Sequence, residues 1–159
     1  IGIQLLRHRS FTFQEFSQRY ATVTGMEDIE LRLQADSNRQ SSTDIIGGVD
    51  FTGNKYDGYA INSLSHTNII EETAQLLNSI NLQYNKLLEA GVARECARMI
   101  LPMATSTTIY MTGTVRSWIH LLDIRDDSHA QKEIQIIAKE MKNIFTSLCP
   151  IISKARGWN

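Results

Sequence analysis

Three potentially cationic side chains, Arg7, His8 and Arg9, follow one another directly after a short apolar segment. The planar fork of an arginine guanidinium matches two oxygens of a phosphate group, so neighbouring arginines suit a pyrophosphate or a nucleotide phosphate. Taken alone, such a triplet is more often a solvent-exposed basic turn. The triplet is therefore a candidate anion-binding cluster that needs support from the rest of the sequence.

A second group of polar side chains follows this cluster closely. Glu15, Ser17 and Arg19 would share one face of an extended segment, because side chains alternate along a strand. Such a face could bind a polar anionic ligand or simply be exposed to solvent. No Gly-x-Ser-x-Gly nucleophile elbow surrounds Ser17, so we interpret this hydroxyl as a ligand-binding group.

The net charge and composition argue against several classes of protein, among them nucleic-acid-binding, metal-binding and membrane-spanning proteins. The net charge is −1, so a phosphate ligand must be held by locally placed cations, and a nucleic-acid polymer is not favoured. The cysteines, Cys96 and Cys149, lie far apart and form no CxxC pair, which predicts reduced thiols and no metal site. No apolar run is long enough for a membrane span and no signal peptide is visible. We expect a cytoplasmic, globular protein.

Helices and short strands must position these residues. Helical spacing of apolar residues predicts a long helix over 62–90 and another that Ser128 caps and Pro150 ends, with shorter helices over 92–100 and 115–124. Extended chain is predicted within 7–24, and a strand over 105–113. We therefore predict one α+β domain over 1–159, in which a small sheet packs with long helices.

The stretch 34–60 is polar and contains Gly47, Gly48, Gly53 and Gly58. Glycine, serine, aspartate and asparagine in such density are typical of loops. Long loops in compact domains often carry function. We predict a long loop here that closes over a ligand.

The sequence RHRSFTFQEFSQRY resembles the RHRx7S signature of the flavin-dependent thymidylate synthase family, in which seven residues separate Arg9 from Ser17. A second block, ECARMILPMATSTTIYMTGTVRSWIHLLDIRDDSHAQKEI, resembles the C-terminal half of that family, and LRLQADSNRQSS resembles a loop in one branch of it. The resemblance covers most of the chain. The family's more N-terminal part, with a histidine-containing flavin-contacting segment, has no counterpart, so we expect that segment to be missing.

The resemblance implies roles for individual residues. Arg125 would lie beside the uracil and polarise it, the nearest role to a catalytic residue. The implied flavin contacts are Arg7, His8, Arg9, Glu15, Thr114, Val115, Arg116 and His120. The implied nucleotide contacts are Gln4, Leu5, Leu6, Arg7, Glu15, Phe16, Ser17, Gln18, Arg19, Arg98 and Arg125, with Arg98 reaching the site from a neighbouring subunit. The family often has Asn at the positions of Thr114 and His120, and both substitutes can still form hydrogen bonds.

The resemblance also implies a reaction and an assembly. FAD would serve as cofactor in the methylation of deoxyuridylate (dUMP), with NADPH and methylenetetrahydrofolate as co-substrates. The implied assembly is a homotetramer with shared active sites. The sequence supports this assembly because the long helix over 62–90 carries Ile69, Leu76 and Leu88 beside its main apolar face.

Other interpretations stay open at this point. Cys96 lies between Arg94 and Arg98, a cationic setting that could lower a thiol pKa and support a thiolate mechanism. The Arg7–Arg19 cluster could instead serve a non-enzymatic nucleotide- or RNA-binding module with Phe11 and Phe13 as stacking groups. A homologue without activity is a third possibility. Without the resemblance, His120, Trp118 and Tyr110 would be interpreted as core residues.

Overall fold

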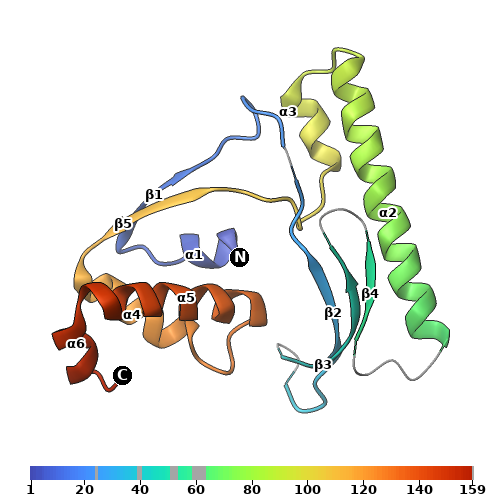
Figure 1. Ribbon diagram of the computed structural model, residues 1–159. Coiled ribbons are helices and arrows are strands. Elements are labelled where there is room, and N and C mark those ends of the chain that lie inside the picture. The colour runs from blue at the N-terminus through green and yellow to red at the C-terminus, as the bar shows by residue number, and fades with distance from the viewer. Residues whose placement is uncertain (24, 39–40, 51–53, 59–63, 159) are drawn as a thin grey trace. The chain divides into compact units, whose positions relative to one another are not determined.

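The computed structural model describes the chain except residues 24, 39–40, 51–53, 59–63 and 159 (Figure 1). The chain forms two compact units, each built from separate stretches of sequence. Unit 1 comprises Ile1–Gln14, Ala35–Ser41 and Ile109–Asn159, and unit 2 comprises Glu15–Gln34 and Ser42–Thr108. The mixture of helices with two small sheets confirms the predicted α+β class.

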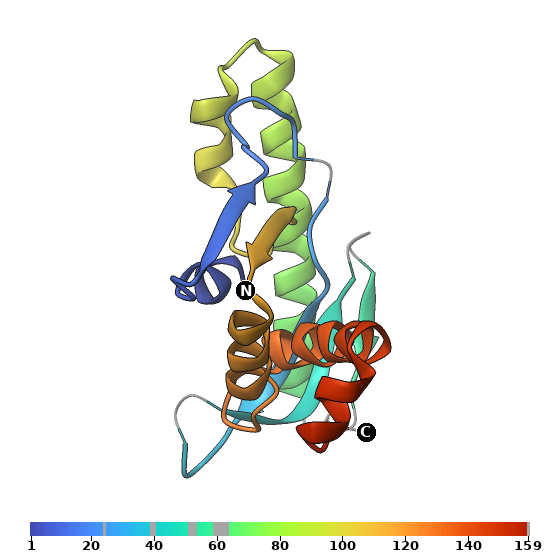
Figure 2. The same ribbon diagram turned by 90° about the vertical axis from the view of Figure 1, so that its left-hand side faces the viewer.

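Unit 1 is mainly helical. Its elements are α1 (Gly2–Leu6), β1 (Phe11–Glu15, whose last residue belongs to unit 2), β5 (Ile109–Gly113), α4 (Val115–Arg125), α5 (Lys132–Leu148) and α6 (Pro150–Ala155). β1 and β5 form a two-stranded sheet, and α4 and α5 pack side by side (Figures 1 and 2). These strands and helices bring the N-terminal motif next to the last residue of α4.

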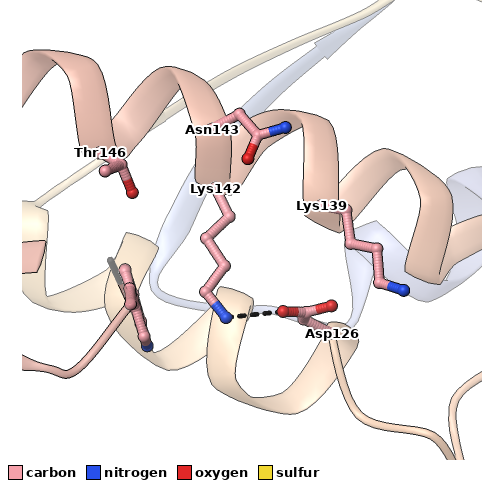
Figure 3. Close-up of a pocket in the computed structure, with 6 residues that line it drawn as sticks. Asp126, Lys139, Lys142, Asn143 and Thr146 are labelled. Carbon is pink, nitrogen blue, oxygen red and sulfur yellow. Dashed lines mark hydrogen bonds and ion pairs between the residues drawn. The ribbon is translucent and has the colours of Figure 1, made fainter.

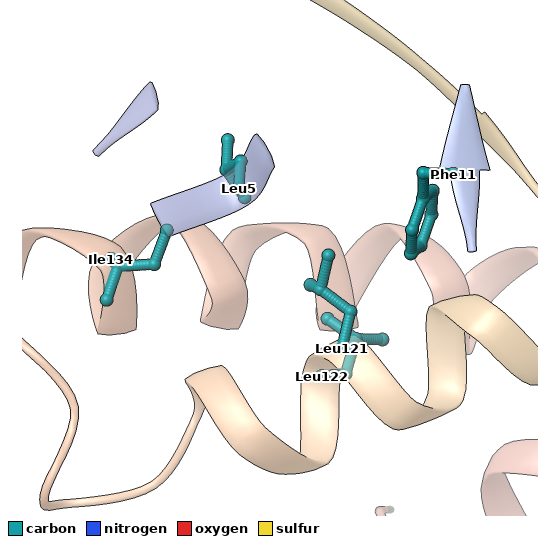
Figure 4. Packing of buried hydrophobic residues seen from close by; sticks show 5 residues of the cluster. All are labelled: Leu5, Phe11, Leu121, Leu122 and Ile134. Atoms are coloured by element: carbon teal, nitrogen blue, oxygen red, sulfur yellow. The ribbon is translucent and has the colours of Figure 1, made fainter. Parts of the chain in front are cut away.

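The core of unit 1 joins the N-terminal segment to the two helices. Its buried members, drawn in Figure 4, are Leu5, Phe11, Leu121, Leu122 and Ile134. The ring of Phe11 meets that of Trp118 edge to face, with centroids 4.8 Å apart. At Gly113, an added Cβ would lie 2.6 Å from Phe11 Cδ1, so only glycine allows β5 to approach this ring. Burial of Leu5 and Phe11 thereby fixes the residues between them.

The predicted start of the last helix is wrong. α5 begins after Gln131, which forms no side-chain cap, and not after Ser128. The Asp127 carboxylate instead accepts a hydrogen bond from the backbone N–H of His129 at 2.8 Å, which holds these residues in a turn. Pro150 does follow the end of α5, but it also opens α6, because a proline at the first helical position loses no hydrogen bond.

Unit 2 combines a sheet with the longest helix. β2 (Ile29–Gln34), β3 (Ser42–Val49) and β4 (Lys55–Asp57) form an antiparallel sheet against which α2 (Leu64–Glu89) packs (Figure 1). α3 (Arg94–Ala97) and the 3₁₀ turn η1 (Arg98–Ile100) follow. The predicted apolar stripe of α2 is confirmed, since Ile70, Ala74 and Tyr84 are buried. Gly91, with φ of 77°, follows the helix end, as predicted.

The prediction of a long loop over 34–60 is wrong, because β3 and β4 lie within it. Its glycines allow strands to approach closely. An added Cβ at Gly48 would lie 2.3 Å from the carbonyl oxygen of Ile29, and one at Gly47 would lie 2.4 Å from Ile70 Cδ1. The polar Ser42, Thr43 and Asp44 are exposed along β3. Residues 39–40, 51–53 and 59–60 of the stretch, including Gly53, lie outside the described residues.

Candidate functional site

Arg125, the last residue of α4, is held from two directions within unit 1. Its Nε donates a hydrogen bond to His8 Nε2 at 2.9 Å. Its Nη2 donates to the backbone oxygen of Gln4 at 3.0 Å, and its Nη1 lies 3.4 Å from Gln4 Oε1. The Gln4 carbonyl is available because it lies in the last turn of α1, where the His8 N–H bonds to Leu5 instead. The guanidinium is therefore fixed by neutral acceptors.

His8 serves as an acceptor in this arrangement and not as a cation. The bond from Arg125 requires a lone pair on Nε2, so the ring is neutral and carries its proton on Nδ1. Burial of the ring lowers the pKa of His8 below its ordinary value of 6.5, and the charges of Arg125 and His120 lower it further. The His8 and His120 rings meet edge to face with centroids 6.4 Å apart.

The positive charge around Arg125 is not paired with a carboxylate among the residues that the structure describes. Burial lowers the pKa of Arg125, and the charge of Arg7 lowers it further. Within the described part of the chain, Arg7, Arg9 and Arg125 form no ion pair with a carboxylate. Arg7 and Arg9 are exposed. Exposed and half-buried guanidinium groups without carboxylate partners are suited to bind an anionic ligand.

The candidate flavin contacts at the start of α4 are accessible. Val115, Arg116 and His120 are exposed, so the interpretation of His120 as a core residue is wrong. Thr114 caps the helix, with its hydroxyl oxygen accepting from the Ser117 N–H at 3.2 Å. Trp118 is packed against the core, whereas Tyr110 is 71% exposed, which contradicts its interpretation as a core residue.

The segment from Glu15, the last residue of β1, to Arg19 belongs to unit 2. Glu15 accepts a hydrogen bond from the Thr107 hydroxyl at 3.1 Å. The carbonyl of Ser17 accepts from the N–H groups of Tyr20 and Ala21, so this segment is a turn. The expected extended face of Glu15, Ser17 and Arg19 is therefore wrong, because the strand ends at Glu15.

Arg19 lies at the surface of unit 2. Its Nη2 pairs with Glu95 Oε2 at 3.4 Å, with both side chains about half exposed. Phe16 and Ser17 are exposed, while Gln18 and Arg98 are half-buried. The structure therefore brings Gln4 and Arg125 together with His8 in unit 1, where Leu5, Leu6 and Arg7 also lie. The other nucleotide candidates, Glu15 to Arg19 and Arg98, belong to unit 2.

Three further residues from the sequence analysis have distinct surroundings. Leu6 is exposed, but the Leu5 side chain is buried in the core, so a ligand contact at this position would use its backbone. Gln131, which lies in the second block that resembles the family, accepts a hydrogen bond from Gln4 Nε2 through its Oε1. Nothing in the local sequence indicated this contact.

An open pocket of about 400 Å³ at the end of α4 has none of these residues in its lining (Figure 3). It is lined by Asp126, Lys139, Lys142, Asn143, Thr146 and Trp158. Lys142 Nζ donates to Asp126 Oδ2 at 2.6 Å and lies 5.0 Å from the centroid of the Trp158 ring. Because Lys142 forms an ion pair with Asp126, we interpret these contacts as structural contacts that hold α4, α5 and the C-terminal residues together.

The described residues include no cluster of three or more His, Cys, Asp or Glu side chains suited to a metal ion. Both cysteines are free; Cys96 is exposed and Cys149 is half-buried. Among the described helices, none combines the length and apolar character of a membrane span.

Comparisons with known proteins agree with the motif. The family model described as thymidylate synthase complementing protein matches residues 2–151. The chain is 43% identical over 159 residues to a probable flavin-dependent thymidylate synthase of Paramecium bursaria Chlorella virus 1, covering 99% of this chain and 67% of the relative. It is 41% identical over 158 residues to the flavin-dependent thymidylate synthase of Synechocystis sp., covering 99% of this chain and 66% of the relative.

A solved structure shares the fold. The UMP/dUMP methylase PolB from Streptomyces cacaoi, bound with 5-Br dUMP, superposes with a TM-score of 0.71 at 26% identity, over 97% of this chain and 64% of that chain. The chain therefore spans about two thirds of the length of these three proteins. The family match and the two relatives show that the chain belongs to the flavin-dependent thymidylate synthase family.

Proposed function

We propose that the protein containing this chain catalyses the reductive methylation of dUMP to dTMP with FAD as cofactor. The observation that carries the proposal is the environment of Arg125. Its guanidinium is held by His8 and Gln4, is close enough to Arg7 to be affected by its charge, and has no ion pair among the described residues. The relatives' names, which refer to flavin and thymidylate, support the same chemistry.

The donor set around the motif fits FAD. Arg7, Arg9 and Arg116 present exposed guanidinium groups, which match the oxygens of a pyrophosphate. His8, Glu15, Thr114, Val115 and His120 complete the set of proposed flavin contacts. When bound, FAD supplies the hydride, after NADPH has reduced it, while methylenetetrahydrofolate supplies the carbon.

Arg125 has the proposed role of stabilising negative charge that develops on the uracil. A guanidinium that is already oriented stabilises such charge without the cost of reorganisation during the reaction. The neutral state of His8 contributes, because a second cation at that distance would repel Arg125. The proposed nucleotide contacts are Gln4, Leu5, Leu6, Arg7, Glu15, Phe16, Ser17, Gln18, Arg19, Arg98 and Arg125.

The proposal includes a homotetramer in the cytoplasm, with Arg98 contributed by a neighbouring subunit. On α2, Ile69, Leu76 and Leu82 are exposed by 48%, 61% and 61%, while Leu88 is half-buried. Exposed aliphatic residues along one long helix are suited to a subunit interface. Light scattering that gives the mass of a single chain for the active full-length protein would contradict this part of the proposal.

The alternative of an RNA-binding module loses support. Phe11 is only 7% exposed and belongs to the core, and Phe13 is half-buried against it. Neither ring presents an open face for stacking on a base.

The test uses the full-length protein with FAD, dUMP labelled with tritium at C5, methylenetetrahydrofolate and NADPH. We expect tritium release with formation of dTMP, and loss of both when any one component is omitted. A flavin-loaded protein that binds dUMP without forming dTMP would contradict the proposed reaction.

A further inference from the structure

A chain of side-chain hydrogen bonds connects the start of α5 to Arg125. Glu133 Oε2 accepts from Gln131 Nε2 at 2.7 Å, and Gln131 Oε1 accepts from Gln4 Nε2 at 2.5 Å. Gln4 in turn presents its Oε1 and its backbone oxygen to Arg125. Residues more than a hundred positions apart in sequence are thereby joined within unit 1.

The two ends of this chain fix the orientation of both amides. An arginine can only donate hydrogen bonds, so Gln4 must turn its oxygen toward Arg125. An ionised glutamate can only accept, so Gln131 must turn its NH₂ group toward Glu133. Gln4 Nε2 and Gln131 Oε1 then face each other as donor and acceptor. A reversed amide at either position would set two donors or two acceptors against each other.

Gln131 is anchored well for such a role. It is the residue before α5, so its backbone is fixed by the helix, and Glu133 lies in the first turn. Gln4, by contrast, belongs to the short helix α1 of five residues, which has little stability of its own. The bond to Gln131 therefore restrains a side chain whose own helix restrains it weakly.

We infer that Gln131 is a positioning residue: it fixes the Gln4 amide so that Arg125 is held in place before the nucleotide binds. The expected effect on dUMP binding rests on the proposed function, because a preoriented Arg125 lowers the free-energy cost of binding dUMP. The orientation itself is a property of the ligand-free protein and can be measured without any ligand.

The experiment compares three variants of the full-length protein. Gln131→Met keeps the length of the side chain but cannot form the hydrogen bond. The double variant Gln131→Glu, Glu133→Gln keeps an oxygen acceptor for Gln4, because the amide at position 133 can donate to the carboxylate at position 131. Gln135→Met is the matched control, since Gln135 lies in the first turn of α5 and its amide bonds, among the described residues, to the backbone oxygens of Ser128 and Ala130.

The first measurement is the solvent exchange of the Arg125 Nη protons by NMR, assigned through their absence in Arg125→Lys. We expect Gln131→Met to speed this exchange severalfold, because Nη1 loses its contact with a restrained Gln4 Oε1, while the double variant and Gln135→Met stay near wild type. Unchanged exchange in Gln131→Met, or equal acceleration in Gln135→Met, would overturn the inference.

The second measurement is dUMP affinity by calorimetry. The loss of one positioning hydrogen bond should weaken binding roughly fivefold in Gln131→Met, with the double variant Gln131→Glu, Glu133→Gln within about twofold of wild type. Wild-type affinity in Gln131→Met would contradict the inferred consequence. Absence of binding to the wild-type protein would contradict the proposed function, while the exchange measurement would still decide the role of Gln131.

Discussion

Arg125 and Arg19 are both proposed to bind the same nucleotide, yet their surroundings differ. Arg125 is half-buried in unit 1 and bonded to neutral acceptors on Gln4 and His8. Arg19 is about half exposed in unit 2 and paired with Glu95. Arg125 is thus oriented without an ion pair to any described carboxylate. Arg19, in contrast, must break its ion pair with Glu95 before it can bind an anion. The contrast suggests that Arg125 is oriented to stabilise the transition state, whereas Arg19 contributes to the initial binding of the nucleotide.

The largest expected effect is at Arg125. Arg125→Ala should lower kcat/KM for dUMP by about a hundredfold or more, because removing a preorganised charge from a reacting centre costs this much in other enzymes. Steady-state kinetics measure it. Arg156→Ala, which removes a surface arginine paired with Asp123, should leave kcat/KM near wild type. An equal loss of kcat/KM in Arg125→Ala and Arg156→Ala would mean that the oriented Arg125 has no special role.

A smaller effect is expected at Arg9, whose exposed guanidinium has no carboxylate partner among the described residues. Arg9→Ala should weaken FAD retention by about tenfold, as expected from the loss of one charge-assisted contact. Flavin absorbance after gel filtration measures the occupancy. Wild-type flavin occupancy in Arg9→Ala would mean that Arg9 does not contact FAD.

The ion pair between Glu95 and Arg19 provides a test of the comparison at Arg19. Glu95→Gln removes the carboxylate that pairs with Arg19, so the guanidinium is released without loss of its charge. Because exposed ion pairs contribute little, dUMP affinity should rise by at most about threefold. Calorimetric titration measures this change. A clear loss of affinity would mean that Glu95 orients Arg19 and does not compete for it.

The smallest expected effect is the pH dependence from His8. Its folded pKa is lowered below 6.5 by burial, Arg125 and His120, so the unfolded chain takes up a proton first as pH falls. The stability contribution of neutral His8 is therefore complete above about pH 6.5 and is lost progressively as pH falls toward the folded pKa. The pKa of Asp127 is lowered from 3.8, so Asp127 affects the pH dependence of stability only at a more acidic pH.

Chemical denaturation at several pH values measures this contribution. His8→Gln retains an oxygen acceptor for Arg125 but cannot titrate, so its stability should fall less steeply below pH 6.5 than that of the wild type. Parallel curves for the two proteins would mean that His8 does not couple to folding.

The sequence predicted those parts of the fold that depend on local periodicity. Ile70, Ala74 and Tyr84 recur at helical spacing and are buried on α2, because a long helix needs one apolar face whatever it packs against. The RHRx7S motif likewise identified Arg7, His8 and Arg9, of which His8 contacts Arg125 in the structure.

Features that depend on distant packing could not be predicted. Gly47 and Gly48 suggested a flexible loop, but their missing Cβ atoms make room for Ile70 and for neighbouring backbone. The bond between Gln4 and Gln131 joins residues 127 positions apart, and no local pattern encodes it. For the same reason, the neutral state of His8 follows only from the position of Arg125 in the folded unit.

The central claim is that the reaction relies on bound flavin and an oriented arginine, with no enzyme thiolate. Cys96 is exposed and Cys149 is half-buried, and both are free, so Cys96→Ser combined with Cys149→Ser should leave the fold intact. We expect the flavin-loaded double variant of the full-length protein to form dTMP from dUMP within about tenfold of the wild-type rate, the allowance covering some loss of packing at the thiols. Complete loss of dTMP formation in a folded, flavin-loaded double variant would contradict the claim and indicate a cysteine nucleophile.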